Sequence, residues 1–207
     1  MGELDHIVLN TTALDAGTAR LEAALGVPMQ PGGQHAAMGT HNTLLSLGPE
    51  DYLEVIAIDP DGTAPDQPRW YDLDRFEGPT RLCHWAVRVS DLDAALDAGP
   101  DGLGTPWSLT RGALSWRMAV PADGTLPFGG LMPALLSWES PHPAPTLQDR
   151  GVRLERLTLQ SPEPDALRDA VARLTNDPRI HIEAAREPDI VAHLQTPGGP
   201  VAIGTLT

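Results

Sequence analysis

Apolar and polar residues alternate in several short segments of this chain, and the first of them opens a unit of recognisable shape. ELDHIVLN at 3–10 alternates with a period of two and predicts a strand, whereas LDAGTARLEAAL at 14–25 carries its leucines near helical spacing and stops at Gly26. Three further strand-like runs follow, at 33–38, 41–48 and 51–59. Because alternation is typical of half-buried strands and the wider spacing of an amphipathic helix, this stretch predicts a βαβββ unit.

The same pattern returns twice along the chain. LDHIVLNTTALDA at 4–16 aligns with LCHWAVRVSDLDA at 82–94 and with LERLTLQSPEPDA at 154–166. The second copy predicts a strand, a helix and three strands at 81–90, 91–98, 106–111, 114–120 and 131–139. The third predicts them at 152–160, 164–175, 180–185, 189–195 and 200–206. A repeat of this kind decides the architecture before any single residue does.

Proline-rich segments divide the repeats. The sequence therefore predicts an α+β protein in which βαβββ modules at 1–60 and 81–140, with a linker at 61–80, pair into one cupped mixed sheet around a cavity. This domain spans residues 1–145, and a third βαβββ-like module spans 146–207.

Histidine occupies the same register in the first two modules. His6 and His84 lie on the leading strands, whereas Glu54 and Glu139 lie on the closing strands of their modules. A pseudo-two-fold arrangement would bring these strands together in one concave sheet. Two imidazoles with one or two carboxylates in a shared cavity match the ligands preferred by Zn²⁺, Fe²⁺, Mn²⁺ or Ni²⁺.

A second interpretation needs no metal ion. His6 and His84 would then be hydrogen-bonded core or rim residues, and Glu54 would pair with an arginine such as Arg88 or Arg117. A buried glutamate without a cation costs several kcal/mol or becomes protonated. Spacing alone leaves both interpretations open.

Other side chains are candidates for a ligand pocket. His35 lies in the glycine-rich segment GGQHAAMGTHN, where it either contacts a ligand or caps an exposed turn. Trp107 and Trp116 are candidates for an aromatic wall. Strand parity predicts that Trp85 and Trp138 pack beneath the sheet, on the face away from His84 and Glu139. Cys83, on the face opposite His84, is expected to be a packed core thiol.

Composition excludes several classes of function. All 14 basic residues are arginine, so neither a lysine Schiff base nor the lysine of a phosphate-binding P-loop is present. The net charge of −14 opposes nucleic acid binding, and residues 1–140 hold 19 acids against seven arginines. A single cysteine, no long apolar run and no leader segment at the N-terminus lead us to expect a cytoplasmic protein of bacterial type that does not engage a membrane.

The first two modules resemble the vicinal oxygen chelate superfamily. DHIVL and YLEVIAIDP carry this resemblance, and Gly33–His35–Gly39–Thr40–Asn42–Leu44 is similar to a motif of its glyoxalase-like proteins. LMPALLSWESPHP at 131–143 is similar to the strand that closes the second module there. The resemblance implies metal ligands at His6, Glu54 and His84 and places Asn42 in the substrate pocket. In this group the fourth ligand is often an acid one residue before the tryptophan, where this chain has Ser137. Glu139 is therefore a candidate to replace that acid or to act as a general base.

The resemblance implies two kinds of function. One is a divalent-metal-dependent lyase, isomerase or dioxygenase that acts on a small oxygenated substrate. The other is a binding protein similar to bleomycin-resistance proteins, which sequesters a cationic or aromatic compound without catalysis. In the third module, Arg156 and Gly204 stand at the registers of His6 and Glu54. That module is therefore expected to have no site and to cover sheet edges or form a homodimer contact.

Overall fold

A computed structural model describes residues 1–206 of the chain. The first module consists of β1 (Glu3–Asn10), α1 (Leu14–Leu25), β2 (Gln30–His35), β3 (Thr40–Ser46) and β4 (Tyr52–Ile58). The strand at 3–10 and the helix at 14–25 have the predicted bounds. The helix ends where Gly26 adopts a φ of 69° and donates its N–H to the carbonyl of Glu22 at 2.8 Å. Glycine occupies this left-handed conformation without steric cost.

The second module repeats the first after a connector that contains the short 3₁₀ segment η1 (Trp70–Arg75). Its elements are β5 (Arg81–Arg88), α2 (Leu92–Ala98), β6 (Thr105–Arg111), β7 (Leu114–Val120) and β8 (Ala134–Trp138). The predicted strand at 131–139 was too long, because residues 131–133 belong to the preceding loop. Asp91 begins α2 by accepting the N–H of Ala94 at 3.0 Å, as an N-cap residue does.

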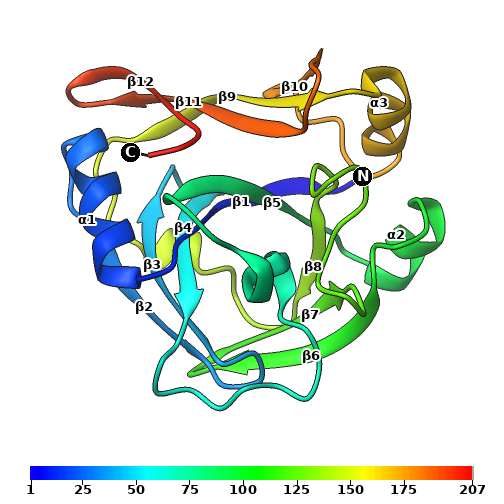
Figure 1. The fold of residues 1–207 in the computed structure, drawn as a ribbon, viewed down its shortest axis with the longest axis horizontal. Helices are drawn as coiled ribbons and strands as arrows, with labels where there is room; N and C mark the ends of the chain where they lie inside the picture. The colour runs from blue at the N-terminus through cyan, green and yellow to red at the C-terminus, as the bar shows by residue number, and fades with distance from the viewer. Residues whose placement is uncertain (207) are drawn as a thin grey trace.

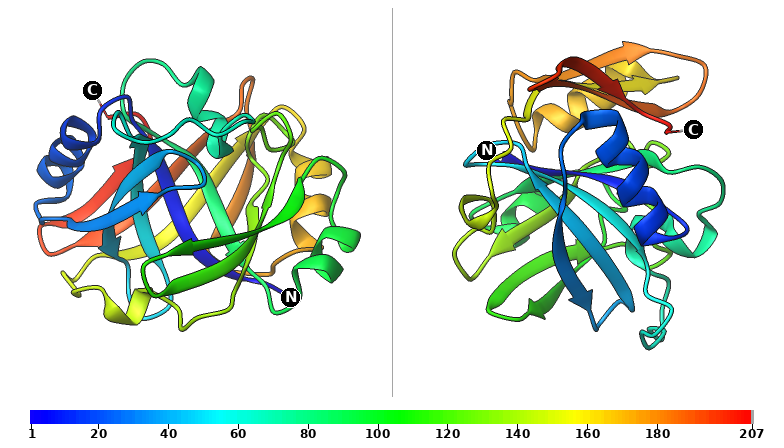
Figure 2. Two further views of the ribbon diagram at one scale, coloured as in Figure 1. Left: turned by 90° about the horizontal axis from the view of Figure 1, so that it is seen from below. Right: turned by 90° about the vertical axis from the view of Figure 1, so that its left-hand side faces the viewer.

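The two modules form one eight-stranded sheet in the order β2-β3-β4-β1-β5-β8-β7-β6. Each leading strand lies parallel to the closing strand of its own module, and β1 and β5 join the modules as an antiparallel pair. The sheet curls strongly (Figure 2), so that its terminal strands β2 and β6 come into contact. The prediction of paired βαβββ modules in a cupped mixed sheet is thereby confirmed.

A hinge containing η2 (Ala144–Thr146) leads to the third unit. Its elements are β9 (Arg153–Ser161), α3 (Pro164–Ala172), β10 (Ile180–Ala184), β11 (Asp189–Thr196) and β12 (Gly199–Ile203). The element order repeats that of the modules, but the strand order β10-β9-β11-β12 does not, because β9 lies between β10 and β11 instead of beside β12.

The four-stranded sheet lies over the outside of the curl at β1 and β5 (Figure 1). Backbone hydrogen bonds tie it there, from Gly2 N–H to the Leu174 carbonyl at 2.7 Å and from Leu82 N–H to the Gly204 carbonyl at 2.8 Å. Arg179 also forms an ion pair with Asp51 of the first module. One continuous apolar core joins both sheets, with Trp85 on one side and Ile190 on the other.

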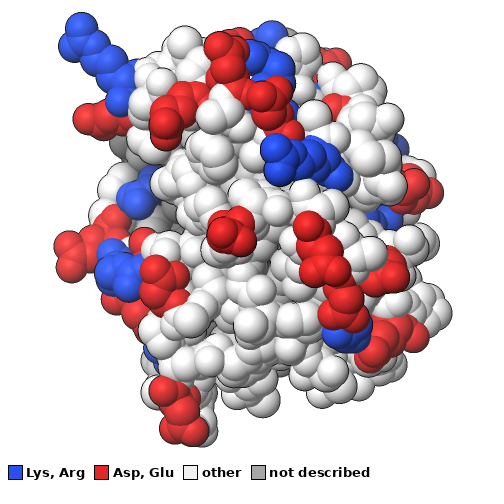
Figure 3. Space-filling view, turned by 90° about the vertical axis from the view of Figure 1, so that its right-hand side faces the viewer, with Lys and Arg blue, Asp and Glu red and all other residues white. Residues whose placement is uncertain are grey.

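The acidic charge is dispersed over the face shown in Figure 3, where acidic and basic side chains alternate with uncharged surface. A dispersed charge of this kind does not form a focused binding patch. Of the helices in residues 1–206, none has the length and apolar character needed to cross a membrane.

Candidate functional site

Residues of both modules and of η1 enclose a small hollow on the concave face of the large sheet. Its cavity measures about 30 Å³, which is space for a water molecule or two but not for an organic ligand. The polar residues that line it are His6, His35, Asn42, Glu54 and Arg111. The aromatic ones are Tyr52, Trp70, Tyr71, Trp116 and Trp138.

His6 reaches the hollow from a bulge in β1. The pairing of β1 with β5 shifts between Leu4 and His6, so Asp5 is an extra residue in the ladder. Bulges of this kind change the direction of side chains. Asp5 Oδ1 lies 2.6 Å from Nδ1 of His6, and Tyr52 stacks on the imidazole with ring centroids 4.6 Å apart. Since Nδ1 donates to the carboxylate, Nε2 is the nitrogen that faces the hollow.

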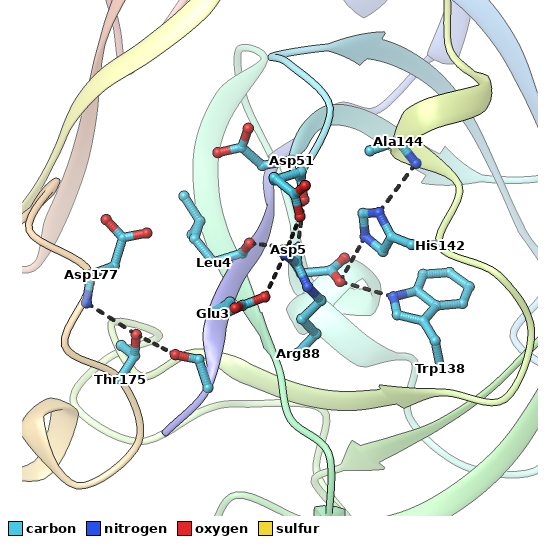
Figure 4. A network of polar contacts seen from close by, with 12 residues as sticks. Glu3, Leu4, Asp5, Asp51, Arg88, Trp138, His142, Ala144, Thr175 and Asp177 are labelled. Atoms are coloured by element: carbon cyan, nitrogen blue, oxygen red, sulfur yellow. Dashed lines mark hydrogen bonds and ion pairs between the residues drawn. The ribbon is translucent and has the colours of Figure 1, made fainter.

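Asp5 is fully buried and is the best-partnered acid of the site. Its second oxygen accepts hydrogen bonds from Nε1 of Trp138 at 2.8 Å and from Nε2 of His142 at 3.0 Å (Figure 4). Burial alone would raise the pKa of Asp5, but the hydrogen bonds and positive charge supplied by His142 and His6 outweigh it and hold the pKa well below its usual range. Neither Asp5 nor His142 was predicted from the sequence, because their contact spans 137 positions.

Glu54 belongs to a second chain of contacts. Its Oε1 accepts a hydrogen bond from Nδ2 of Asn42 at 2.5 Å, and its Oε2 lies 3.5 Å from Nε2 of His6. Asn42 Oδ1 in turn accepts from the backbone N–H of Gly33 at 2.8 Å and from Arg111 at 3.0 Å. A Cβ at Gly32 would come within 2.0 Å of that same oxygen, so the glycine makes room for the amide. Glu54 therefore pairs with neither Arg88 nor Arg117.

Arg111 closes the hollow from the second module, and it was not predicted from the sequence either. It donates to Nε2 of His35 at 3.1 Å, while Nδ1 of His35 lies 3.0 Å from Oγ1 of Thr40. These partners identify Nδ1 as the protonated nitrogen. Burial, aided by the nearby charge of Arg111, lowers the pKa of His35 to about 3, so the ring is neutral. His35 is thus a buried pocket residue and not an exposed turn residue.

His84 lies on the same face of the sheet as His6 but does not contact it. Tyr71 stands between them: its hydroxyl is 3.4 Å from Nε2 of His6, and its ring stacks on His84 with centroids 5.1 Å apart. Nε2 of His84 lies 2.9 Å from the Tyr71 carbonyl, which can only accept, so this nitrogen donates. The predicted set of His6, Glu54 and His84 is therefore only partly assembled, because η1 occupies the space between the two imidazoles.

The second module also lacks a second acid. Val8 pairs with Glu54 in the first module, and Ala86, its repeat counterpart, pairs with Ala134 in the second. The counterpart of Glu54 is thus Ala134, and neither Ser137 nor Glu139 occupies that register. Glu139 follows the end of β8 and is exposed. Placing Glu139 on the concave face was wrong, because Leu136 and Trp138 take that face and the intervening positions point outward.

The tryptophans that line the hollow are not the pair that the sequence predicted. Trp138 lines the hollow instead of packing beneath the sheet, and Trp116 lies beside it with ring centroids 5.5 Å apart. Trp107 is half-buried against the core and does not line the hollow. Trp85 is buried on the opposite face, as expected, and donates to the Leu131 carbonyl at 2.8 Å.

Two further candidates carry no reactive group into the hollow. Burial raises the pKa of the Cys83 thiol to about 11, so it stays protonated. In the third unit, Arg156 stands at the sequence position of His6 and donates to Nε2 of His193 at 3.3 Å. Gly204, its predicted partner at the position of Glu54, follows β12, which does not lie beside β9.

Comparison with known proteins agrees with this architecture. The sequence profile of the glyoxalase-like domain matches residues 4–175, well over half of the chain. The chain belongs to the glyoxalase-like domain family. Solved members of the vicinal oxygen chelate superfamily share the fold. No curated protein matches the sequence.

Three solved structures illustrate the likeness. A hypothetical protein from Staphylococcus aureus is 15% identical, with 91% of this chain and 88% of that chain covered and a TM-score of 0.62. An Mn(II)-bound glyoxalase from Novosphingobium aromaticivorans is 11% identical, with 98% and 82% covered and a TM-score of 0.51. A mutant 4-hydroxymandelate synthase from Streptomyces coelicolor is 16% identical, with 97% and 62% covered and a TM-score of 0.50. At these identities the likeness shows the fold alone.

The residues of this glyoxalase-like chain do not fit a resident metal ion as they are arranged. Within residues 1–206, no group of three His, Cys, Asp or Glu side chains is close enough to hold one. His6 and Glu54 are adjacent, but His84 donates to a backbone carbonyl and Ala134 contributes no ligand. Zinc sites in proteins have three or four such ligands around one point.

Proposed function

We propose that this glyoxalase-like protein binds a small, flat organic molecule in the hollow without a resident metal ion. The observation that carries the proposal is the position of Tyr71. Its ring separates the two histidines, and its carbonyl engages the donor nitrogen of His84. The remaining pair of His6 and Glu54 is already supported within the protein by Asp5 and Asn42.

The lining of the hollow supports a ligand that presents a carbonyl or carboxylate oxygen. Arg111 is a cation at one side, and Trp70 carries an indole N–H that is buried without a partner in residues 1–206. Such a donor gains a hydrogen bond from an acceptor oxygen and otherwise lowers stability. Trp116 and Trp138 supply apolar faces on which a planar ring would stack.

Entry of such a ligand requires η1 to move, because the hollow holds only about 30 Å³. Tyr71 and Asp72 both have positive φ, of 58° and 53°, in a segment of the connector. Non-glycine residues in this region cost roughly 1–3 kcal/mol each. Displacing η1 would relieve this strain, and the relief would offset part of the free energy needed to unpack Tyr71 from the two histidines.

A metal-dependent lyase, isomerase or dioxygenase is the second candidate. Nε2 of His6 lies 3.5 Å from Oε2 of Glu54, and His84 stands on the next strand of the same face. One structural neighbour is described as Mn(II)-bound. This candidate requires Tyr71 to leave the space between the histidines, and it predicts a divalent ion that binds only when η1 is displaced.

Metal analysis and ligand titration distinguish the two candidates. Protein purified without chelator or affinity nickel is expected to hold no stoichiometric divalent ion, and chelator is expected to leave its thermal midpoint unchanged. One ion per chain, lost on His6→Ala, would establish the metal-dependent candidate instead. Tyr71→Ala sharpens the comparison, because a metal site blocked only by this ring would then bind Mn²⁺ or Zn²⁺.

Benzoate is a suitable probe of the hollow, monitored by tryptophan fluorescence. We expect Arg111→Leu to weaken benzoate binding at least tenfold, since a charge-assisted hydrogen bond to a carboxylate contributes about 1.5–3 kcal/mol. Arg117→Leu is the matched control, because Arg117 pairs with Asp93 outside the hollow. Equal affinity of both variants and the wild type would refute binding in the hollow.

A further inference from the structure

A second cavity lies on the other side of Tyr71 from the hollow and is much larger, at about 290 Å³. Four parts of the chain enclose it: the facing ends of β1 and β5, the connector with η1, residues 125–131 of the loop before β8, and the start of β11 in the third unit. Ligand sites of small molecules begin at about this volume. Unlike the hollow, this cavity has room for an organic molecule without movement of the backbone.

Apart from Oδ1 of Asp72, which forms an ion pair with Arg75, two buried side chains in this cavity each have one atom unpaired. Nδ2 of Asn10 donates to the Tyr71 carbonyl at 2.7 Å, and Nε2 of His84 donates to the same oxygen at 2.9 Å. The opposite atoms, Oδ1 of Asn10 and Nδ1 of His84, are buried and have no hydrogen-bond partner anywhere in residues 1–206. Gly130 lies beside His84, where a Cβ would come 3.8 Å from Nδ1, and its backbone opposes part of the lowering of the His84 pKa, although Nδ1 has no partner at hydrogen-bonding geometry in residues 1–206.

The shared carbonyl fixes the hydrogen-bonding character of both unpaired atoms. A carbonyl oxygen only accepts, so Asn10 must present its amide nitrogen to Tyr71, and its oxygen is left as an acceptor. His84 must carry its proton on Nε2, so in the neutral ring Nδ1 is likewise an acceptor. Both acceptors are at least nine-tenths buried, with exposed fractions of 1% and 5%. Leaving such atoms unpaired is costly, which marks a place for a donor.

The cavity is lined by two arginines and two aspartates, so its charged side chains balance in number. Arg75 pairs with Asp72 at 2.6 Å. Arg81 donates to the Glu77 carbonyl at 3.1 Å and lies over the ring of Phe76 at 4.6 Å. Asp189 accepts the N–H of Ile190 at 2.9 Å. The two positive and two negative charges sum to zero, so the cavity favours a ligand without net charge.

We propose that this cavity is a second binding site, for a small neutral molecule that presents two adjacent O–H or N–H donors to Asn10 Oδ1 and His84 Nδ1. A vicinal diol carries this donor pair, and so does a ring with an amino group beside a ring N–H. The site differs from the hollow in its chemistry, because the unpaired group there is the donor of Trp70 and here the unpaired groups are acceptors. The two sites can therefore be tested independently.

Two matched pairs of probes test the site on the full chain by NMR titration. trans-1,2-Cyclohexanediol supplies O–H donors, and 1,2-dimethoxycyclohexane is its capped counterpart. Isocytosine supplies N–H donors, and 2-(dimethylamino)-3-methylpyrimidin-4-one, which keeps the 4-oxo group, is its capped counterpart. We expect at least one uncapped probe to bind tenfold or more tightly than its capped partner, and the arm that responds identifies the donor class. Equal binding within both pairs, or none at all, would overturn the proposal.

Variants locate the binding. Asn10→Leu and His84→Phe are expected to abolish the preference for the uncapped probe, whereas Asn176→Leu and His181→Phe, at exposed positions, are expected to preserve it. Arg111→Leu, which removes a residue of the hollow, should also leave this preference intact. Loss of the preference in Arg111→Leu alone would place the donor probes in the hollow and refute the second site.

A measurement on the wild-type protein covers the case in which Asn10→Leu or His84→Phe does not fold. Long-range ¹H–¹⁵N spectra of the imidazoles should show His84 protonated on Nε2, with an Nδ1 resonance that moves upfield when the uncapped probe donates to it. A proton on Nδ1, or a crystal soaked with the uncapped probe that shows only ordered water at both acceptors, would overturn the proposal.

Discussion

The two modules share a topology and a strand register, but they present opposite chemistry to the hollow. In the first module the concave face carries His6, Asn42 and Glu54. At the corresponding registers of β7 and β8 the second module has Met118 and Ala134, followed by Leu136. The second module keeps one polar counterpart, His84, but this side chain donates its hydrogen bond to the Tyr71 carbonyl.

This difference explains why a duplicated fold need not give a symmetric site. A metal centre shared between modules would require ligands from both. Here one module supplies a hydrogen-bonded acid–base network, and the other supplies Trp116, Trp138 and the cation Arg111. A polar wall facing an aromatic wall suits an organic ligand that has one polar edge and one flat face.

The largest expected effect comes from the first module's buried acid. Asp5→Ala should lower the free energy of unfolding by about 3–5 kcal/mol, because it leaves the buried donors of His6, Trp138 and His142 without their acceptor. Chemical denaturation measures this loss. Asp93→Ala, which breaks an exposed ion pair with Arg117, should have a much smaller effect, because water screens that pair. Similar losses in both variants would contradict the central position given to Asp5.

The same residue predicts an acid dependence of stability. The folded pKa of Asp5 is lowered, so its stabilising contribution is complete above the unfolded pKa of 3.8 and declines as the pH falls below it toward the folded value. Asp5→Asn should therefore have a flatter stability profile than the wild type below pH 4. Parallel profiles of the two proteins in that range would show that Asp5 is not the ionised partner of these histidines.

Making the second module resemble the first should also destabilise the protein. Ala134→Glu places a carboxylate at the register of Glu54, on a residue that is 1% exposed. Its burial without a cation should cost roughly 3 kcal/mol in thermal or chemical unfolding. Adding Tyr71→Ala to this variant removes the ring between the two histidines. If Glu54 and Ala134 hold equivalent registers, Mn²⁺ or Zn²⁺ should then restore part of the lost free energy of unfolding. No recovery with either ion would weaken the assigned equivalence.

A separate effect is expected in the pH dependence of the two buried, neutral histidines. Burial lowers the pKa of His35 to about 3 and that of His84 to about 4, from an unfolded value of 6.5. Both rings take up a proton more readily when unfolded, so each lowers stability by about 1.4 kcal/mol per pH unit as the pH falls from 6 to 4. His35→Gln should remove about half of this combined slope, whereas the exposed control His181→Gln should leave it unchanged.

Much of the fold was predictable from the sequence. The bounds of β1 and α1 followed from the spacing of apolar residues and from Gly26, and the repeats gave the pairing of modules. The site was less accessible to this reasoning. His6, His35, Asn42, Glu54 and Trp116 do line one hollow, but the parity used for Glu139 and Trp138 failed. Both positions lie at or beyond the end of β8, whose start at Ala134 the sequence did not reveal.

The sequence by itself determined the local structure and the repeat, since hydrophobic spacing and turn residues act over a few positions. It also supplied each polar residue of the hollow. Only the tertiary structure decided which of them meet. Asp5 contacts His142 across the whole domain, Arg111 reaches Asn42 and His35 from the other module, and Tyr71 from the connector separates His6 from His84. Such long-range contacts are set by packing, and a linear pattern of residue types carries no signal for them.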